Sequence, residues 1–195
     1  MTDTKQNMTR EEWLTSVAKL AEPIFNEADL TFPERWRVTC GFPCKNATGA
    51  NKRRVGECHS SRMSADGSFE MFVTPMVAGN ADAIKILLHE MVHACVGTEH
   101  GHRKPFSQAC KALGFVGKPT QAEPGDEDWK PFFDLAVESF GEYPHAKLDV
   151  SNMKKQSTRM VKVACPCGCS LRMTRKWIDE VGTPTCGCGE QMEVA

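Results

Sequence analysis

The sequence has no long run of apolar residues and almost no excess of charge of either sign. Its 195 residues include 24 Lys and Arg against 25 Asp and Glu, which gives a net charge of -1 at pH 7. No whole-chain electric field therefore draws the protein to nucleic acid or to a membrane surface. Residues 1–12 lack the apolar core of a secretory signal, and no apolar stretch is long enough to span a bilayer. We expect a cytoplasmic protein with no membrane partner.

Tyrosine is nearly missing, with one residue, whereas cysteine is abundant, with ten. Cysteines of a cytoplasmic protein rarely form disulfides, so these ten are expected to be metal ligands or free thiols. Apolar residues make up 41% of the chain and charged residues 25%, the balance of an ordinary globular protein with a sizeable core. The length suits one medium domain, or one domain followed by a small module.

Apolar periodicity and turn residues predict an α+β fold. A capping box at residues 9–12 marks the start of the first helix. The predicted helices cover about residues 10–28, 81–96, 105–113 and 134–140. The predicted strands of a small antiparallel sheet cover about residues 36–44, 55–60 and 68–74. Residues 117–131, rich in Pro, Gly and acidic side chains, predict a loop.

One motif in the second of these helices indicates chemistry. Residues 89–93 read H-E-M-V-H. Two imidazoles four residues apart lie on one face of a helix and can hold one metal ion. Glu90, between His89 and His93, is then placed to take a proton from a metal-bound water. This is the H-E-x-x-H arrangement of zinc metallopeptidases. The simpler alternative is a surface helix that carries two histidines by chance.

A catalytic zinc ion needs a third protein ligand in addition to a water. The candidates just downstream are Glu99, His100 and His102. His102 is preferred, because it lies between a glycine and a Pro-Phe pair, where the chain enters another helix and can turn an imidazole back onto the first. His100 is the second choice, against the simpler interpretation of a solvated loop histidine.

The C-terminal residues 160–195 contain two cysteine pairs about twenty residues apart, Cys165 with Cys167 and Cys186 with Cys188. Such pairs predict a structural zinc ribbon with four thiolate ligands. Each pair is C-x-C rather than the usual C-x-x-C, and Cys169 is the spare cysteine. A redox-active dithiol is the competing interpretation.

The ribbon is mildly basic, since residues 151–195 contain seven Lys and Arg against four Asp and Glu. Three basic residues surround one tryptophan: Arg172, Arg175, Lys176 and Trp177. Basic side chains around an exposed aromatic ring can bind phosphate and stack on a base, so DNA is a candidate partner of the ribbon. The alternatives are a solvated hairpin whose tryptophan covers the small core, or a grip on the protein substrate.

Two other groups of residues invite a functional interpretation. Cys40, Cys44, Cys58 and His59 can form a further cluster, although buried thiols and a hydrogen-bonded histidine are the preferred interpretation. The basic run at residues 52–54 can contact nucleic acid, although a solvated loop is preferred.

The H-E-x-x-H motif, followed by Gly101-His102 and Phe106 in a G-H-x-x-x-F pattern, resembles the SprT-like zinc metallopeptidase family. Spartan, its eukaryotic branch, cleaves proteins crosslinked to DNA. The likeness covers about residues 10–115, includes the basic hairpin at residues 53–73, and extends to a C-terminal metal ribbon similar to that of versions carried by bacterial viruses. The interval from His93 to His102 is shorter than in many members.

This resemblance implies a zincin-like helical metallopeptidase domain over residues 1–140, a linker over 141–159 and a small β zinc ribbon over 160–195. It implies an endopeptidase that acts on proteins, with DNA-associated proteins as the expected class. His89, His93 and His102 would hold a catalytic Zn2+ with Glu90 as general base, and the ribbon would hold a structural Zn2+. The alternative is a zinc-stabilised nucleic-acid-binding or transcription-associated protein with little or no peptidase activity, and a different zinc hydrolase is a third possibility. The sequence does not indicate an oligomeric state.

Overall fold

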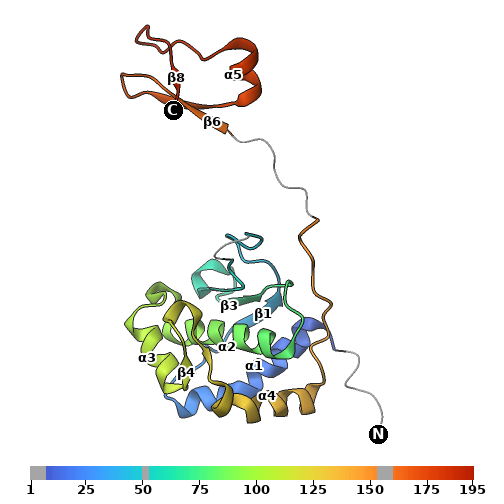
Figure 1. Ribbon diagram of the computed structural model, residues 1–195. Helices are drawn as coiled ribbons and strands as arrows, with labels where there is room; N and C mark the ends of the chain where they lie inside the picture. The colour runs from blue at the N-terminus through green and yellow to red at the C-terminus, as the bar shows by residue number, and fades with distance from the viewer. Residues whose placement is uncertain (1–7, 50–52, 153–159) are drawn as a thin grey trace. The chain divides into compact units, whose positions relative to one another are not determined.

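A computed structural model describes residues 8–49, 53–152 and 160–195 of the chain. The chain divides into two compact units, residues 1–150 and residues 151–195 (Figure 1). Each unit has a hydrophobic core of its own. In the described residues no helix combines the length and the apolar character needed to cross a membrane.

The first unit combines helices with two small sheets. Its helices are α1 (Arg10–Glu27), α2 (Asn80–Val96), α3 (Lys104–Ala112) and α4 (Asp126–Phe140). Its strands are β1 (Trp36–Cys40), β2 (Gly56–His59), β3 (Phe69–Val73), β4 (Phe115–Val116) and β5 (Glu123–Pro124). Short 3-10 turns lie between them: η2 (Ser61–Met63), η3 (Thr98–His100) and η4 (Pro119–Gln121). The α+β class is as predicted.

Helix α1 begins at the predicted capping box. The Glu12 backbone N–H donates to Thr9 Oγ1, and the Thr9 backbone N–H donates to the Glu12 carboxylate. These two bonds satisfy backbone donors that the first helical turn otherwise leaves free. Most of the apolar residues that follow at helical spacing are fully buried, Trp13 and Phe25 among them, and Leu20 and Ile24 are partly buried.

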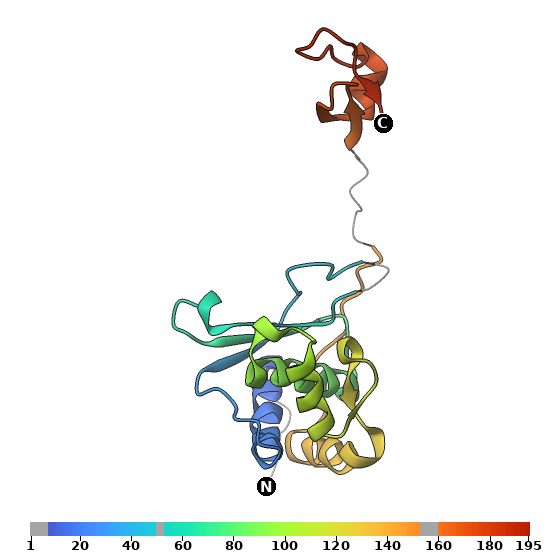
Figure 2. The same ribbon diagram turned by 90° about the vertical axis from the view of Figure 1, so that its left-hand side faces the viewer.

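The main sheet has the order β1-β3-β2, and helices α1 and α2 pack against it (Figure 2). Strands β2 and β3 pair antiparallel, as the turn at residues 65–67 predicts, but β1 pairs with β3 in parallel. The predicted antiparallel sheet is therefore wrong, and the sheet is mixed. The loop after β1 carries the chain across to the far edge of the sheet. The hairpin then brings β3, whose Met71 and Val73 are fully buried, into the centre.

Helix α4 is longer than predicted and takes up the last six residues, 126–131, of the segment predicted to be a loop. It begins at Asp126 and accommodates Pro131 in its second turn. Acidic side chains in the first turn suit the positive end of the helix dipole, and Trp129 and Phe132 are buried on the core. Their burial outweighs the Pro and Gly composition that predicted a loop.

The predicted linker over residues 141–159 is wrong in its first part, because residues up to 150 belong to the first unit. The Trp13 indole N–H donates to the Gly141 carbonyl at 2.9 Å, and Tyr143 is buried against the Trp13 ring. Farther along, the Leu148 backbone N–H donates to the Pro75 carbonyl at 2.8 Å. We call residues 141–150 the strap. The predicted linker residues 153–159 lie outside the described part of the chain.

The second unit is a small β module with one helix. It contains β6 (Met160–Ala164), β7 (Ser170–Thr174), α5 (Arg175–Val181) and β8 (Glu193–Val194). The sheet order is β7-β6-β8, and both pairings are antiparallel. The buried core of its described residues is Val163, Cys165 and Met192.

Candidate metal centres

Three histidine rings of the first unit converge on one point. Nε2 of His89 lies 3.1 Å from Nε2 of His102, and Nε2 of His93 lies 3.2 Å from the same atom. Three imidazoles that share a tetrahedral zinc ion at about 2.0–2.1 Å place their nitrogens about 3.3 Å apart. These two separations therefore match those of a metal site, and all three ligand atoms lie within 4.8 Å of one another.

The chain reaches this geometry through a short turn after α2. Gly97 ends α2 with a φ of 92°, and the 3-10 turn η3 and Gly101, with a φ of 50°, reverse the chain before α3. Positive φ angles of this kind favour glycine. His102 then lies between this reversal and α3, facing the two histidines of α2.

The Ala122 carbonyl and the Phe106 ring contact the three histidine rings and orient them. Nδ1 of His89 lies 2.8 Å from the Ala122 carbonyl oxygen, so Nδ1 carries the proton and Nε2 keeps its lone pair free. The fully buried Phe106 contacts all three rings and stacks on His93, with centroids 4.2 Å apart. These contacts fix the direction in which the lone pairs point.

Burial keeps the three imidazoles neutral. It lowers the pKa of His93 to about 3, and the neighbouring His89 and His102 rings and the charge of Arg54 lower it further. The pKa values of His89 and His102 are also lowered, in both cases chiefly by burial. A histidine must be neutral to bind a metal ion, so the site favours the ligating form.

Glu90 lies on the same helix and is buried in contact with β2. Burial raises the pKa of its carboxyl to about 8, against the opposing charge of Arg54. A Cβ atom on Gly56 would lie 2.7 Å from Ile86 Cγ2 and closer still to a carboxylate oxygen of Glu90. Strand β2 therefore approaches this carboxylate as closely as only glycine permits.

The alternative third ligands lie apart from the histidine group. Among the described residues, that group contains His89, His93 and His102, and neither Glu99 nor His100. The Glu99 side chain is largely exposed and folds back over Gly97. Nε2 of His100 lies 4.0 Å from Oε1 of Glu99. The structure thus brings together the histidines that the sequence favours.

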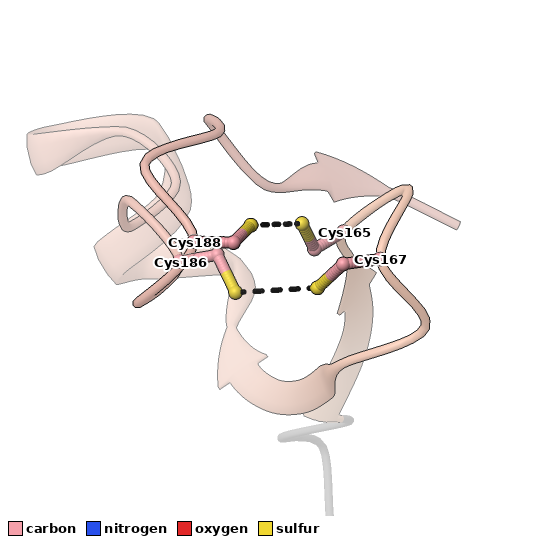
Figure 3. A group of neighbouring side chains, drawn as sticks. All are labelled: Cys165, Cys167, Cys186 and Cys188. Atoms are coloured by element: carbon pink, nitrogen blue, oxygen red, sulfur yellow. Dashed lines mark hydrogen bonds between the residues drawn. The ribbon is translucent and has the colours of Figure 1, made fainter.

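The four predicted ribbon cysteines also converge, as Figure 3 shows. Sγ of Cys165 lies 3.4 Å from Sγ of Cys188, and Sγ of Cys167 lies 3.6 Å from Sγ of Cys186. These distances exceed the roughly 2.05 Å of a disulfide bond. They approach the ~3.8 Å between thiolates that share a tetrahedral zinc ion. Cys169 lies outside the group.

Two loops of the same form carry these cysteines. In the first, the Cys165 N–H donates to the Cys169 carbonyl and the Gly168 N–H to the Cys165 carbonyl. In the second, the Cys186 N–H donates to the Glu190 carbonyl and the Gly189 N–H to the Cys186 carbonyl. The two glycines have φ angles of 94° and 95°, which explains why each C-x-C pair is followed by glycine.

Backbone donors also favour the thiolate form in the second loop. A hydrogen bond from the Cys188 N–H and further bonds from neighbouring thiols lower the pKa of Cys186 to about 6. Since the thiolate is the form that binds metal, Cys186 is prepared to act as a ligand.

Two contributors to the histidine site carry no sequence signal of their own. The Ala122 carbonyl orients His89, but every residue has a carbonyl group. Gly56 lets β2 approach Glu90 closely, but a single glycine at the start of a strand predicts nothing specific.

The basic run at residues 52–54, a candidate nucleic-acid contact in the sequence, makes contacts within the first unit through Arg53 and Arg54. Arg54 forms an ion pair with Glu57, Arg53 donates to the Gly49 carbonyl, and residue 52 lies outside the described part of the chain.

Comparison with known proteins gives no family model, no curated protein and no solved structure that matches this chain. Any functional conclusion therefore depends on the chemistry of these two groups of potential metal ligands.

Proposed function

We propose that the protein is a zinc-dependent endopeptidase of the SprT-like type, with a zincin-like first unit and a C-terminal zinc ribbon. The convergence of three imidazoles, two of which flank Glu90 in the sequence of α2, is the observation that carries the proposal. A purely structural zinc site has four protein ligands, whereas three histidines leave a coordination position for water or substrate. His102 is exposed, so at least one member of the group lies at the surface of the first unit.

The donor set fits zinc. Imidazole nitrogens are common zinc ligands, and the spacing of the three nitrogens agrees with a tetrahedral ion. When bound, zinc supplies a Lewis acid that acidifies water and polarises a peptide carbonyl. Residues around the ligands orient them: the Ala122 carbonyl orients the His89 ring, and Phe106 packs against all three rings.

Glu90 is the proposed general base. Its carboxylate takes a proton from the attacking water and passes that proton to the leaving amine. The low-polarity surroundings that raise its pKa make the carboxylate a stronger base than an exposed glutamate. A divalent cation nearby would lower that pKa again and keep the group ionised at neutral pH.

The ribbon is proposed to hold a second, structural zinc ion with Cys165, Cys167, Cys186 and Cys188. We further propose that it directs the peptidase to DNA-associated proteins. Trp177 is 51% exposed, and the ammonium group of Lys176 lies 5.2 Å from its ring centroid. An exposed aromatic ring beside basic groups is suited to stacking and phosphate contact. The same surface supports the second candidate function, a zinc-stabilised nucleic-acid-binding protein with little peptidase activity.

Replacement of the base tests the proposal. Glu90→Gln keeps the size of the side chain but removes its basicity, so we expect full zinc content and loss of peptide cleavage, by about 1000-fold or more. The measurements are zinc per chain by mass spectrometry and cleavage of a DNA-bound protein, with and without DNA and a chelator. Cleavage by Glu90→Gln at the native rate would remove the general-base assignment.

Histidine variants separate the metal site from general damage. His93→Ala is expected to lose one zinc ion per chain and all cleavage. His100→Ala is the matched control, because this histidine lies two residues from His102 but outside the group, and it should retain both properties. If the native protein binds zinc at the histidines, binds DNA and cleaves nothing, the second candidate function holds.

A further inference from the structure

The outer face of the main sheet carries a third group of potential metal ligands. Cys44, Glu57 and His59 place one ligand atom each within 4.8 Å of one another. Glu57 and His59 alternate along β2 and so share one face of the strand. Gly56 lies on the opposite face, towards Glu90 of α2, and the loop after β1 brings Cys44 over the outer face.

Two potential ligand atoms approach the same nitrogen, Nε2 of His59. Sγ of Cys44 lies 3.5 Å from Nε2 of His59, and Oε2 of Glu57 also lies 3.5 Å from this Nε2. A catalytic Cys-His-acid triad would instead place the acid on the other ring nitrogen, Nδ1. One N–H at Nε2 donates well to a single partner, so hydrogen bonding does not explain why both atoms approach it. A metal ion about 2.0–2.3 Å from each ligand places thiolate, imidazole and carboxylate atoms ~3.5 Å apart.

The surroundings hold Glu57 in the ligating form. Burial opposes its ionisation, but a hydrogen bond from the Cys44 N–H and the charge of Arg54 outweigh it and keep the pKa of Glu57 below its usual value. Arg54 bonds Oε1, while Oε2 faces His59 and accepts from the Cys44 N–H at 2.6 Å. A partner behind a ligating carboxylate is the usual support for a metal ligand.

We propose that Cys44, Glu57 and His59 form a further zinc site of the first unit, with a water molecule as the fourth ligand, and that the ion joins the loop after β1 to β2. One thiolate and one carboxylate neutralise the charge of a Zn2+ ion, and mixed S, N and O ligands suit this borderline-soft metal. Sequence reasoning preferred buried thiols here. Cys44 is exposed, while Cys40 and Cys58 are partly buried and lie outside the group. The proposal does not depend on peptidase activity.

Zinc stoichiometry of the full chain tests the site. After saturation with zinc and removal of unbound metal, we expect three zinc ions per chain in the native protein and two in Cys44→Ser and in His59→Ala. Cys40→Ser is the matched control, because it removes a thiol from the same stretch of sequence but outside the group, and should retain three. Equal zinc content in the native protein and in Cys44→Ser would overturn the proposal, whatever the total, because an empty histidine site lowers both totals alike.

Alkylation of the native protein supplies a second measurement that needs no variant. Cys44 is exposed, so an added alkylating reagent should modify its thiol quickly in the metal-free protein. Bound zinc should slow that reaction by at least tenfold. A short peptide with one cysteine, added to both samples, is the reference and should react at the same rate in each, whereas the ribbon cysteines are expected to change with their own metal. Equal alkylation of Cys44 with and without zinc would show that no ion binds there. Neither measurement uses cleavage, so failure here is distinct from failure of the proposed function.

Discussion

At the scale of single residues, the position of Glu90 depends on a neighbour that has no side chain. Gly56 of β2 lies so close to Glu90 and Ile86 that a Cβ atom could not fit without a shift of one of them. Its close approach limits where the Glu90 carboxylate can lie. Displacement of a reacting group by about 1 Å can cost on the order of 100-fold in rate.

We therefore expect Gly56→Ala to lower peptide cleavage by about 100-fold while the histidine site keeps its zinc. Cleavage kinetics and zinc content check this expectation together. Gly79→Ala is the control, because its Cβ atom would meet only a carboxylate oxygen of Asp82 at 3.8 Å. Native activity in Gly56→Ala would mean that Glu90 does not act from its present position.

The residues that sequence reasoning could find are those whose spacing is local. His89 and His93 share a helix face because four residues make about one turn, and His102 follows a glycine that reverses the chain. The Ala122 carbonyl and Gly56 were not predictable, since each acts through backbone brought near by the fold. Cys44, Glu57 and His59 come together only because a loop crosses the sheet.

At the scale of elements, the parallel pairing of β1 and β3 places Arg37 directly opposite Glu70. The Arg37 guanidinium bonds Glu70 and also Asp66, in the turn between β2 and β3. These hydrogen bonds from Arg37 are the main reason that the pKa values of Glu70 and Asp66 are held below their usual range. The cluster therefore joins β1 to the hairpin.

This cluster predicts a pH dependence of stability. Carboxyls with lowered pKa values stabilise the fold above their unfolded pKa of about 4, and this contribution is lost as the pH falls through their folded pKa values. Arg37→Met should therefore unfold at lower denaturant concentration than the native protein at pH 7, and the difference should shrink as the pH is lowered below 4. Chemical denaturation of both proteins at several pH values measures this. A difference independent of pH would exclude these carboxylates as its cause.

Sequence patterns predicted elements well where the signal is local, and poorly where it is not. The β2–β3 hairpin follows from its turn, and α1 from its capping box and apolar periodicity. The parallel partner of β3 requires a crossover, which periodicity does not encode. Helix α4 was missed over its first half because Pro131 and nearby acidic residues resemble loop composition, whereas burial of Trp129 decides the outcome.

At the scale of the whole molecule, the two units differ greatly in how much core they have. The first unit buries residues from α1, α2, α3, α4 and the main sheet in one continuous core. In the described residues of the second unit, only Val163, Cys165 and Met192 are buried. So small a core seldom folds without a metal ion or a disulfide, and a structural zinc ion contributes about 10–16 kcal/mol of binding free energy in comparable peptides.

Removal of the ribbon metal should thus unfold the second unit alone. With a strong chelator, or in Cys186→Ser, the amide NMR signals of residues 160–195 should collapse to unfolded positions. The signals of the first unit should keep their dispersion. His93→Ala is the converse control and should leave the ribbon signals unchanged. Retention of the ribbon signals in the metal-free protein would show that its fold does not require zinc.

The strap has a consequence for any attempt to isolate the smallest fragment that keeps the histidine group. A chain ending at Phe140, where the last long helix stops, would lack the Gly141 carbonyl and leave the indole N–H of fully buried Trp13 without its acceptor. An orphaned donor of this kind costs about 1–3 kcal/mol. It would also uncover the Trp13 ring that Tyr143 now packs against. Val150, not Phe140, is therefore the natural C-terminus of an autonomous fragment.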